Sequence, residues 1–95
     1  MRIFGLLLPA YWKGTTVRIA DPASARGKEA ELLFRHLDAK EQYKRSVYVS
    51  PKRGATGRIV SLMKYKSPEG SPFIYYGVLV KDVLYALEES RLAKV

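Results

Sequence analysis

The stretch from Gly57 to Val80 reads GRIVSLMKYKSPEGSPFIYYGVLV, and it decides the fold expected for this chain. Two runs rich in β-branched and aromatic residues, 58–66 and 72–80, lie on either side of SPEGS. The proline and glycine of SPEGS favour a turn. Because the connection is short, the two strands are expected to pair in antiparallel fashion. A β-hairpin is therefore the centre of the predicted fold.

Two further strands are predicted before this hairpin. Residues 2–8 form an apolar run, and residues 15–20 alternate, with Val17 and Ile19 on one side. The connection PAYWKG between them predicts a first hairpin. A secretory signal peptide is the alternative for the apolar start, but Pro9 interrupts the run and basic residues follow it. We therefore expect a buried first strand.

Helical periodicity is found on both sides of the central strands. Asp21 and Pro22 suit a helix N-cap and first turn, and an apolar stripe continues to about Arg45. SVYVS at 46–50 alternates as a strand does. Residues 81–95 carry a second apolar stripe at helical spacing. The sequence thus predicts a helix from Pro22 to about Arg45, or one whose regular part begins at Lys28 because Gly27 is unfavourable in a helix interior. A strand, the central hairpin and a final helix follow.

The predicted chain is a single α+β domain, residues 1–95, in the order β-β-α-β-β-β-α. Its mainly antiparallel sheet would have about five strands, with both helices on one face and the other face open to solvent. Strict alternation in strand 58–66 divides its side chains into two sets, and neither is purely polar, so the exposed face stays undetermined. One set is Ile59, Ser61, Met63 and Tyr65; the other is Arg58, Val60, Leu62, Lys64 and Lys66.

Positive charge is concentrated in one segment. The chain has 17 Lys and Arg against 9 Asp and Glu, which gives a formal net charge of +8. Residues 40–66 hold eight bases and one acid, Glu41, hence +7, and the rest of the chain carries only +1. Such a concentration favours a polyanionic partner over charge placed for solubility. The eight bases are Lys40, Lys44, Arg45, Lys52, Arg53, Arg58, Lys64 and Lys66.

Aromatic residues are interleaved with these bases. The chain contains seven Tyr, three Phe and one Trp. Cations that follow phosphates, together with rings that stack on unpaired bases, are typical of single-stranded nucleic-acid binding. The alternative for each tyrosine is a cross-strand pair at the edge of the core. The predicted nucleic-acid-binding residues are Lys44, Arg45, Tyr48, Lys52, Arg53, Arg58, Lys64, Tyr65, Lys66 and Tyr75.

The loop PKRGATG, residues 51–57, has two interpretations. Its two glycines allow backbone N–H groups to approach an anion, beside Lys52, Arg53 and Arg58. It is equally well a flexible hairpin tip. It lacks the spacing and the Lys-Ser/Thr ending of a nucleotide-binding P-loop.

Residues suited to catalysis or metal binding are scarce. There is no cysteine, which rules out disulfides and thiolate metal sites and suits a reducing cytosol. His36 is the only histidine, and the pairs Glu29/Glu31 and Glu88/Glu89 do not resemble an acid–base dyad. We therefore expect neither an enzyme nor a cofactor. Small basic ribonucleases of the RelE toxin type, which work through Arg, Lys and Tyr, are the enzyme class left open.

The segment GRIVSLMKYKSPEGSPFIYYGVLVKDVLYALEE resembles the nucleic-acid-binding domain of the coactivators called positive cofactor four, and the related PUR-type domains. The resemblance covers about half of the chain. It implies a curved antiparallel sheet that binds single-stranded DNA or melted duplex, usually as a dimer whose helices pack together. It also implies that Arg58, Lys64, Tyr65 and Lys66 contact the ligand, with Leu84 and Leu87 at dimer or core positions.

GKEAEL and the later K-x-P-x-G turn are similar to the small chromatin proteins of thermophilic archaea, which are SH3-like barrels. The sequence therefore predicts a cytoplasmic, sequence-tolerant protein that binds single-stranded nucleic acid, with DNA favoured. A double-stranded-DNA chromatin protein and a small RNA-binding protein, ribosome-associated or toxin-like, are the alternatives. A membrane partner is not expected, because no run approaches the roughly 18 apolar residues of a membrane span. A homodimer is left open.

Overall fold

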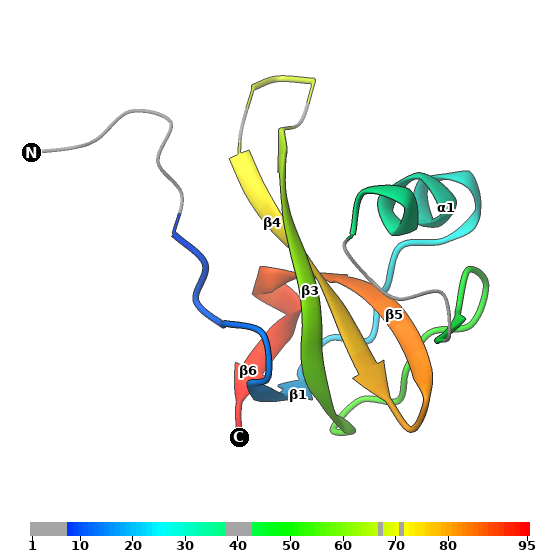
Figure 1. Cartoon of the computed structure of the whole chain (residues 1–95), viewed down its shortest axis with the longest axis vertical. Coiled ribbons are helices and arrows are strands. Elements are labelled where there is room, and N and C mark those ends of the chain that lie inside the picture. Colours follow the sequence, from blue (N-terminus) through cyan, green and yellow to red (C-terminus); the bar gives the residue numbers. More distant parts are fainter. Residues whose placement is uncertain (1–7, 38–42, 67, 71) are drawn as a thin grey trace, which may run out of the picture.

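A computed structural model describes residues 8–37, 43–66, 68–70 and 72–95, apart from the side chain of Tyr65. Six strands form one sheet in the order β2-β5-β4-β3-β1-β6, with one α-helix beside it (Figure 1). The α+β class is therefore correct. The elements in chain order are β1 (Thr16–Ile19), α1 (Gly27–His36), β2 (Lys44–Arg45), β3 (Thr56–Lys66), β4 (Pro72–Val80), β5 (Val83–Glu88), the 3-10 turn η1 (Glu89–Arg91) and β6 (Leu92–Lys94).

The central hairpin is confirmed. Strands β3 and β4 pair antiparallel from Arg58 opposite Leu79 to Lys66 opposite Pro72. Strand β1 also lies where a strand was predicted, but it pairs with β3 and β6. The predicted partner strand, residues 2–8, lies almost entirely outside the described residues. All pairings are antiparallel except that of β2 with β5, which is parallel.

A β-bulge in β3 corrects the predicted alternation of this strand. The register shifts between Ile59 and Ser61, so that Val60 and Ser61 point to the same side of the sheet. Ile59 packs in one core cluster, whereas Val60 and Met63 pack against another. The set that placed Ile59 with Ser61 and Met63 is therefore wrong. A bulge inserts one unpaired residue and bends the strand, which strict period two cannot anticipate.

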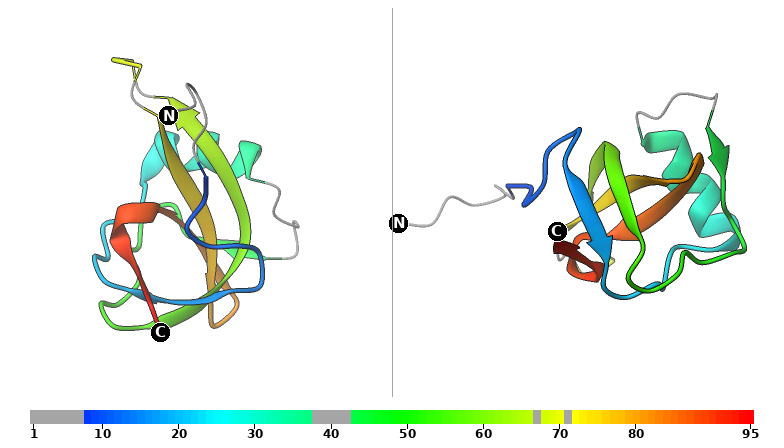
Figure 2. Two further views of the ribbon diagram at one scale, coloured as in Figure 1. Left: turned by 90° about the vertical axis from the view of Figure 1, so that its left-hand side faces the viewer. Right: turned by 90° about the horizontal axis from the view of Figure 1, so that it is seen from below.

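Each face of the sheet covers a core cluster, so the expectation of one wholly bare face is wrong; only the outer face at β1 and β3 keeps an exposed set of side chains. The inner core draws residues from five successive strands of the sheet order, from β5 to β6, and the sheet curls around it (Figure 2). The helix-side core lies between the outer face and α1. The inner core comprises Tyr11, Val17, Ile19, Ile59, Ile74, Tyr76, Val78, Leu87 and Leu92. The helix-side core comprises Ala25, Ala30, Leu33, Phe34, Leu37, Leu84 and Ala86.

The first helix is shorter than the full predicted range. The residues before it form a turn and a hydrogen bond to the sheet instead of a helix. Asp21 does not cap a helix: its Oδ1 accepts a hydrogen bond from the N–H of Ala23 at 3.1 Å. The N–H of Ala25 then donates to the carbonyl of Ala86 on β5 at 3.0 Å. The helix begins at Gly27, which has φ of +61°. It ends at His36, and Leu37 is extended.

The predicted final helix is wrong, and strands take its place. Lys81 and Asp82 have φ of 47° and 68°, so they form a two-residue turn that returns β4 as β5. Leu84 and Leu87 are fully buried on opposite faces of β5. A strand with a core on each face carries apolar residues on both sides and imitates a helical stripe. Leu84 and Leu87 are thus core residues, and no helix carries them to a dimer interface.

The predicted strand 46–50 is also wrong; only Lys44 and Arg45 pair, along β5. Backbone groups of Ser46 and Val47 form hydrogen bonds with β5 and with the start of α1. The N–H of Ser46 donates to the carbonyl of Leu84 at 2.9 Å, and the carbonyl of Val47 accepts the N–H of Gly27 at 2.8 Å. Helix α1 has ten residues, and no helix in the described ranges is long and apolar enough to cross a membrane.

Ser61 and Gly77 form the closest contact across β3 and β4. A Cβ on Gly77 would lie 2.4 Å from the Oγ of Ser61, but 3.7 Å from its Cβ. Ser61 is fully buried, and its hydroxyl has no hydrogen-bond partner in the described structure. An unpaired buried hydroxyl costs stability, and a methyl group added opposite it would overpack the site.

We expect Gly77→Ala to lower the free energy of unfolding by about 1–3 kcal/mol, as overpacked cores usually do. Ser61→Ala should not destabilise, because it removes an unpaired polar group. In the double variant the clash with Oγ is gone, so Gly77→Ala should cost clearly less there. Urea unfolding of all four proteins closes this cycle. Strictly additive effects would contradict the close contact.

Candidate nucleic-acid interface

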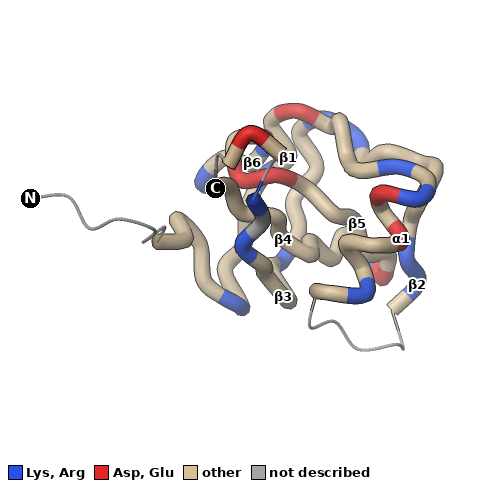
Figure 3. Tube along the Cα trace, turned by 90° about the horizontal axis from the view of Figure 1, so that it is seen from above, with Lys and Arg blue, Asp and Glu red and all other residues tan. Residues whose placement is uncertain are grey.

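The structure separates the predicted basic residues. Lys52 and Arg53 lie in the loop before β3, whereas Lys64 and Lys66 lie near the opposite end of this strand. An 11-residue strand spans roughly 35 Å, so the two groups cannot share one small site. Figure 3 shows the same division, with bases along β2 and α1 on one side and along β3 on another. Lys40 lies outside the described residues.

Arg58 is separated from Lys64 by face as well as by distance. It precedes the bulge and lies opposite Thr16 on β1. Ile59, its neighbour, points into the inner core, so Arg58 points to the outer face. Lys64 lies two residues after Leu62, which packs against the inner core, so Lys64 points to the inner face. Both side chains are exposed, but they do not form a common surface.

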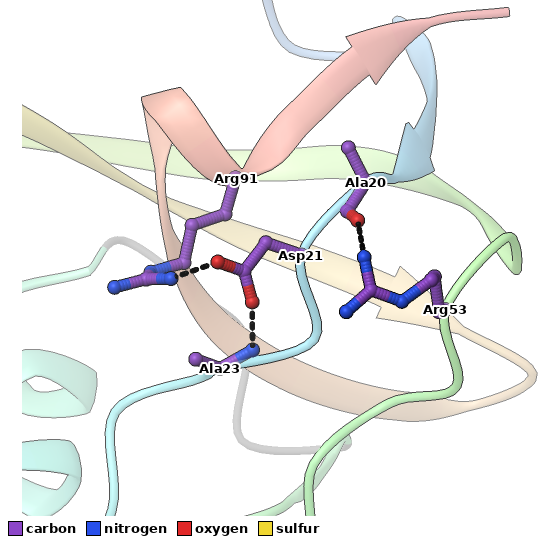
Figure 4. Close-up of polar contacts among 5 residues, drawn as sticks. All are labelled: Ala20, Asp21, Ala23, Arg53 and Arg91. Carbon is purple, nitrogen blue, oxygen red and sulfur yellow. Dashed lines mark hydrogen bonds and ion pairs between the residues drawn. The ribbon is translucent and has the colours of Figure 1, made fainter.

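Arg53 is tied to the loop that follows β1. Its guanidinium donates to the carbonyl of Ala20 at 2.8 Å (Figure 4). The same loop is fixed by an ion pair between Asp21 and Arg91. Because one of its N–H groups is used for this contact, Arg53 holds the loop 51–55 in place. The tether argues against a flexible tip, and the anion-binding interpretation of this loop stays a prediction.

Tyr75 supports the helix rather than an exposed site. It packs against the helix-side core, and its hydroxyl donates to Oε1 of Glu29 on α1 at 3.2 Å. Burial, followed by the charge of Glu29, raises the pKa of Tyr75 from 10.0 to about 12. Burial and a hydrogen bond to Glu89 likewise raise the pKa of the buried Tyr76. Both tyrosines therefore contribute to stability as neutral groups.

The free energy of unfolding is expected to fall as the pH rises from about 10 to 12. In this range the unfolded chain releases the phenolic protons of Tyr75 and Tyr76, and the folded protein retains them. Each such tyrosine lowers stability by about 1.4 kcal/mol per pH unit. Urea unfolding at pH 9, 10, 11 and 12 measures the slope. Tyr75→Phe and Tyr76→Phe should each flatten it. Equal slopes for the natural protein and both variants would contradict the assignment.

Other predicted residues meet at a groove along the β2 edge of the sheet. Its first hollow, of about 320 Å³, lies between the segment 44–49 and β5. Its second hollow, of about 350 Å³, lies between the loop 51–55 and the β4–β5 turn. The two hollows adjoin, because Val83 and Tyr85 line both. The first is lined by Lys44, Arg45, Ser46, Val47, Tyr48, Val49, Val83 and Tyr85, and the second by Pro51, Lys52, Ala55, Val80, Lys81, Val83 and Tyr85.

Tyr48 stands exposed on a backbone that is anchored on both sides. Its relative exposure is 71%, and that of Val49 is 67%. Before it, the hydroxyl of Ser46 donates to the carbonyl of Val49. After it, Oγ of Ser50 accepts a hydrogen bond from the guanidinium of Arg26 at 2.7 Å. A ring held out in this way loses little conformational entropy when a ligand covers it.

The rim of the groove is positively charged. Lys44, Arg45, Lys52 and Lys81 line the two hollows, and among the described residues no acid does. Asp82 is exposed beside Lys81 in the turn and is the nearest acid along the chain. The guanidinium of Arg45 also lies 6.0 Å from the centre of the Phe34 ring, at the outer limit of a cation–π contact. The arrangement can bind an anion next to a flat apolar group.

Sequence reasoning found part of this groove and missed part. It named Lys44, Arg45, Tyr48 and Lys52, which the structure brings together. It missed Lys81, Val83 and Tyr85, because the segment 81–95 was taken as a helix. The signal was the pair Lys81-Asp82 between two apolar runs, which is a weaker hairpin turn than Asn-Gly or Asp-Gly. The side chain of Tyr65 lies outside the described part of the structure.

Comparison of the chain with protein-family models, with curated proteins and with solved structures gave no match. Within the described ranges, no group of three or more His, Cys, Asp or Glu residues is placed to hold a metal ion. The geometry and charge of the groove are therefore the features that bear on function.

Proposed function

We propose that this protein is a cytosolic, non-enzymatic, sequence-tolerant binder of single-stranded nucleic acid, and that the groove between β2, β5 and the loop 51–55 is its binding site. The observation that carries the proposal is the exposed Tyr48 on an anchored loop beside apolar hollows rimmed by four bases. Phosphates would pair with the bases, and unpaired nucleobases would stack on the ring and enter the hollows.

The groove favours a single strand over a duplex. Its walls are apolar side chains and tyrosines, which gain most from contact with base faces. In a duplex these faces are covered unless the helix is kinked. Each hollow also lies at the lower end of the size of ligand pockets, which suits a base or two rather than a helix.

A double-stranded-DNA protein is the second candidate, and one surface supports it. Thr16 pairs with Arg58, and Arg18 pairs with Thr56, across β1 and β3. All four side chains are exposed, and together they offer two guanidinium groups and two hydroxyls to a phosphate backbone. On this proposal Arg58 and Arg18, rather than Tyr48, contact DNA.

Two charge-matched double variants test the position of the site. Lys44→Gln/Arg45→Gln removes two charges from the groove, and Lys64→Gln/Lys66→Gln removes two from the distant end of β3. We expect the first to weaken binding of a labelled dT20 strand by about tenfold and to reduce the salt slope by about one unit. The second should change affinity by less than about threefold. Fluorescence anisotropy at 50 and 200 mM salt measures both, and equal losses would place the site elsewhere.

Tyr48→Ala tests the mode of binding. Loss of one stacked base should weaken dT20 binding by about fivefold to 150-fold, whereas Tyr48→Phe should retain it. Duplex affinity that equals single-strand affinity, unchanged by Tyr48→Ala but lowered by Arg18→Gln/Arg58→Gln, would support the chromatin-type alternative. Cleavage of an RNA probe would instead indicate the toxin class.

A further inference from the structure

The groove is built as two similar halves on either side of Tyr85. Each half has its own hollow, of about 320 and 350 Å³. The second half has two bases, Lys52 and Lys81; the first is lined by Lys44 and Arg45, although the guanidinium of Arg45 is directed toward Phe34 on the helix side. Tyr85 and Val83 are the only residues common to both linings. Within the described part of the chain, Tyr85 is the only aromatic residue that lines the second hollow, so stacking there depends on its ring.

Tyr85 is held in place from the sheet side. It lies on β5 opposite Val78 of β4, which is fully buried, and it packs against the inner core while remaining half-exposed. The buried part of the side chain fixes the ring, and the exposed part faces the groove. Tyr48 supplies a second exposed ring, in the first hollow alone.

We propose that Tyr85 divides the groove into two nucleotide subsites, so that the unit recognised is two successive nucleotides of one strand. This inference rests on the proposed function. One base enters the first hollow beside Tyr48, and the next enters the second hollow against Tyr85. The phosphodiester between them crosses near Val83, and the bases at either end neutralise the flanking phosphates. Selectivity for base identity is not expected, because the hollows are mainly apolar.

The length dependence of affinity tests the subsites. Unlabelled thymidylates of one, two, three, four and ten nucleotides, each with a 5′-phosphate, are titrated into the full chain by calorimetry at low salt. We expect affinity to rise at least about tenfold from one nucleotide to two, and by less than about threefold from two to three. A dinucleotide with one abasic residue should bind no better than about threefold above the mononucleotide. An even rise with each added nucleotide would overturn the inference.

Tyr85 variants give an independent readout. Tyr85→Leu keeps apolar bulk against the inner core but removes the ring, and it should abolish the step between one and two nucleotides. Tyr85→Phe should preserve this step. If Tyr85→Leu does not fold, as judged by circular dichroism, the length series and the abasic dinucleotide on the natural chain decide alone.

The outcomes separate this inference from the proposed function. If the ten-nucleotide strand binds and Lys44→Gln/Arg45→Gln weakens it, but neither the length step nor the Tyr85→Leu effect is seen, the subsites are wrong and the proposed function stands. If no strand binds at any length, both are wrong.

Discussion

The close pairing of β3 with β4 is the contact on which the rest of the molecule depends. Strand β3 is the longest strand of the described sheet. It pairs with β1 near its start and extends to the projecting tip of the hairpin at its end. Two glycines make the pairing possible. A Cβ on Gly57 would come within 2.7 Å of the side chains of Val78 and Val80, and one on Gly77 would meet Ser61. Side chains at these positions would force the strands apart, so the curl of the sheet depends on their absence.

The curl decides where charge can lie. Because each face of the sheet covers a core, no broad open face exists on which cations and rings could be spread. Charged side chains lie at the strand ends, in the turns, on the exposed side of α1 and on the uncovered parts of β1 and β3. A binding surface must then be built at an edge, from short segments of different strands and loops. The groove has this character, since it combines β2, the segment 46–55 and the start of β5.

Much of the sheet could be predicted from the sequence, and the failures have identifiable physical causes. The hairpin was found because its two runs and its turn are strong local signals. The last helix was wrong because β5 has a core on each side, and its apolar residues then satisfy a helical period as well. The bulge at Val60 was not visible, since the inserted residue is itself apolar and finds a place in the helix-side core. The end of α1 at His36 follows from an extended Leu37, and the predicted apolar stripe gave no sign of it.

The candidate groove shows the same limit at the level of function. Composition alone located four of its residues, because a run of bases with few acids is visible without any fold. It could not show that Lys64 and Lys66 lie far away, or that Tyr75 bonds to Glu29 beneath α1. These assignments depend on long-range pairing, such as that of β5 with both β4 and β2. Local sequence carries little information about such pairings.

The bases on β2 have a structural explanation that must be weighed against binding. Strand β2 is an edge of the sheet, and charged residues on a very short edge strand prevent unwanted pairing with other chains. That explanation accounts for Lys44 and Arg45. It does not account for Tyr48 and Val49, because two exposed apolar side chains beside a sheet edge promote the association that the charges would prevent. Exposed apolar side chains at a basic sheet edge promote association unless a ligand covers them. A polyanion with flat apolar groups would neutralise the bases and cover the ring of Tyr48.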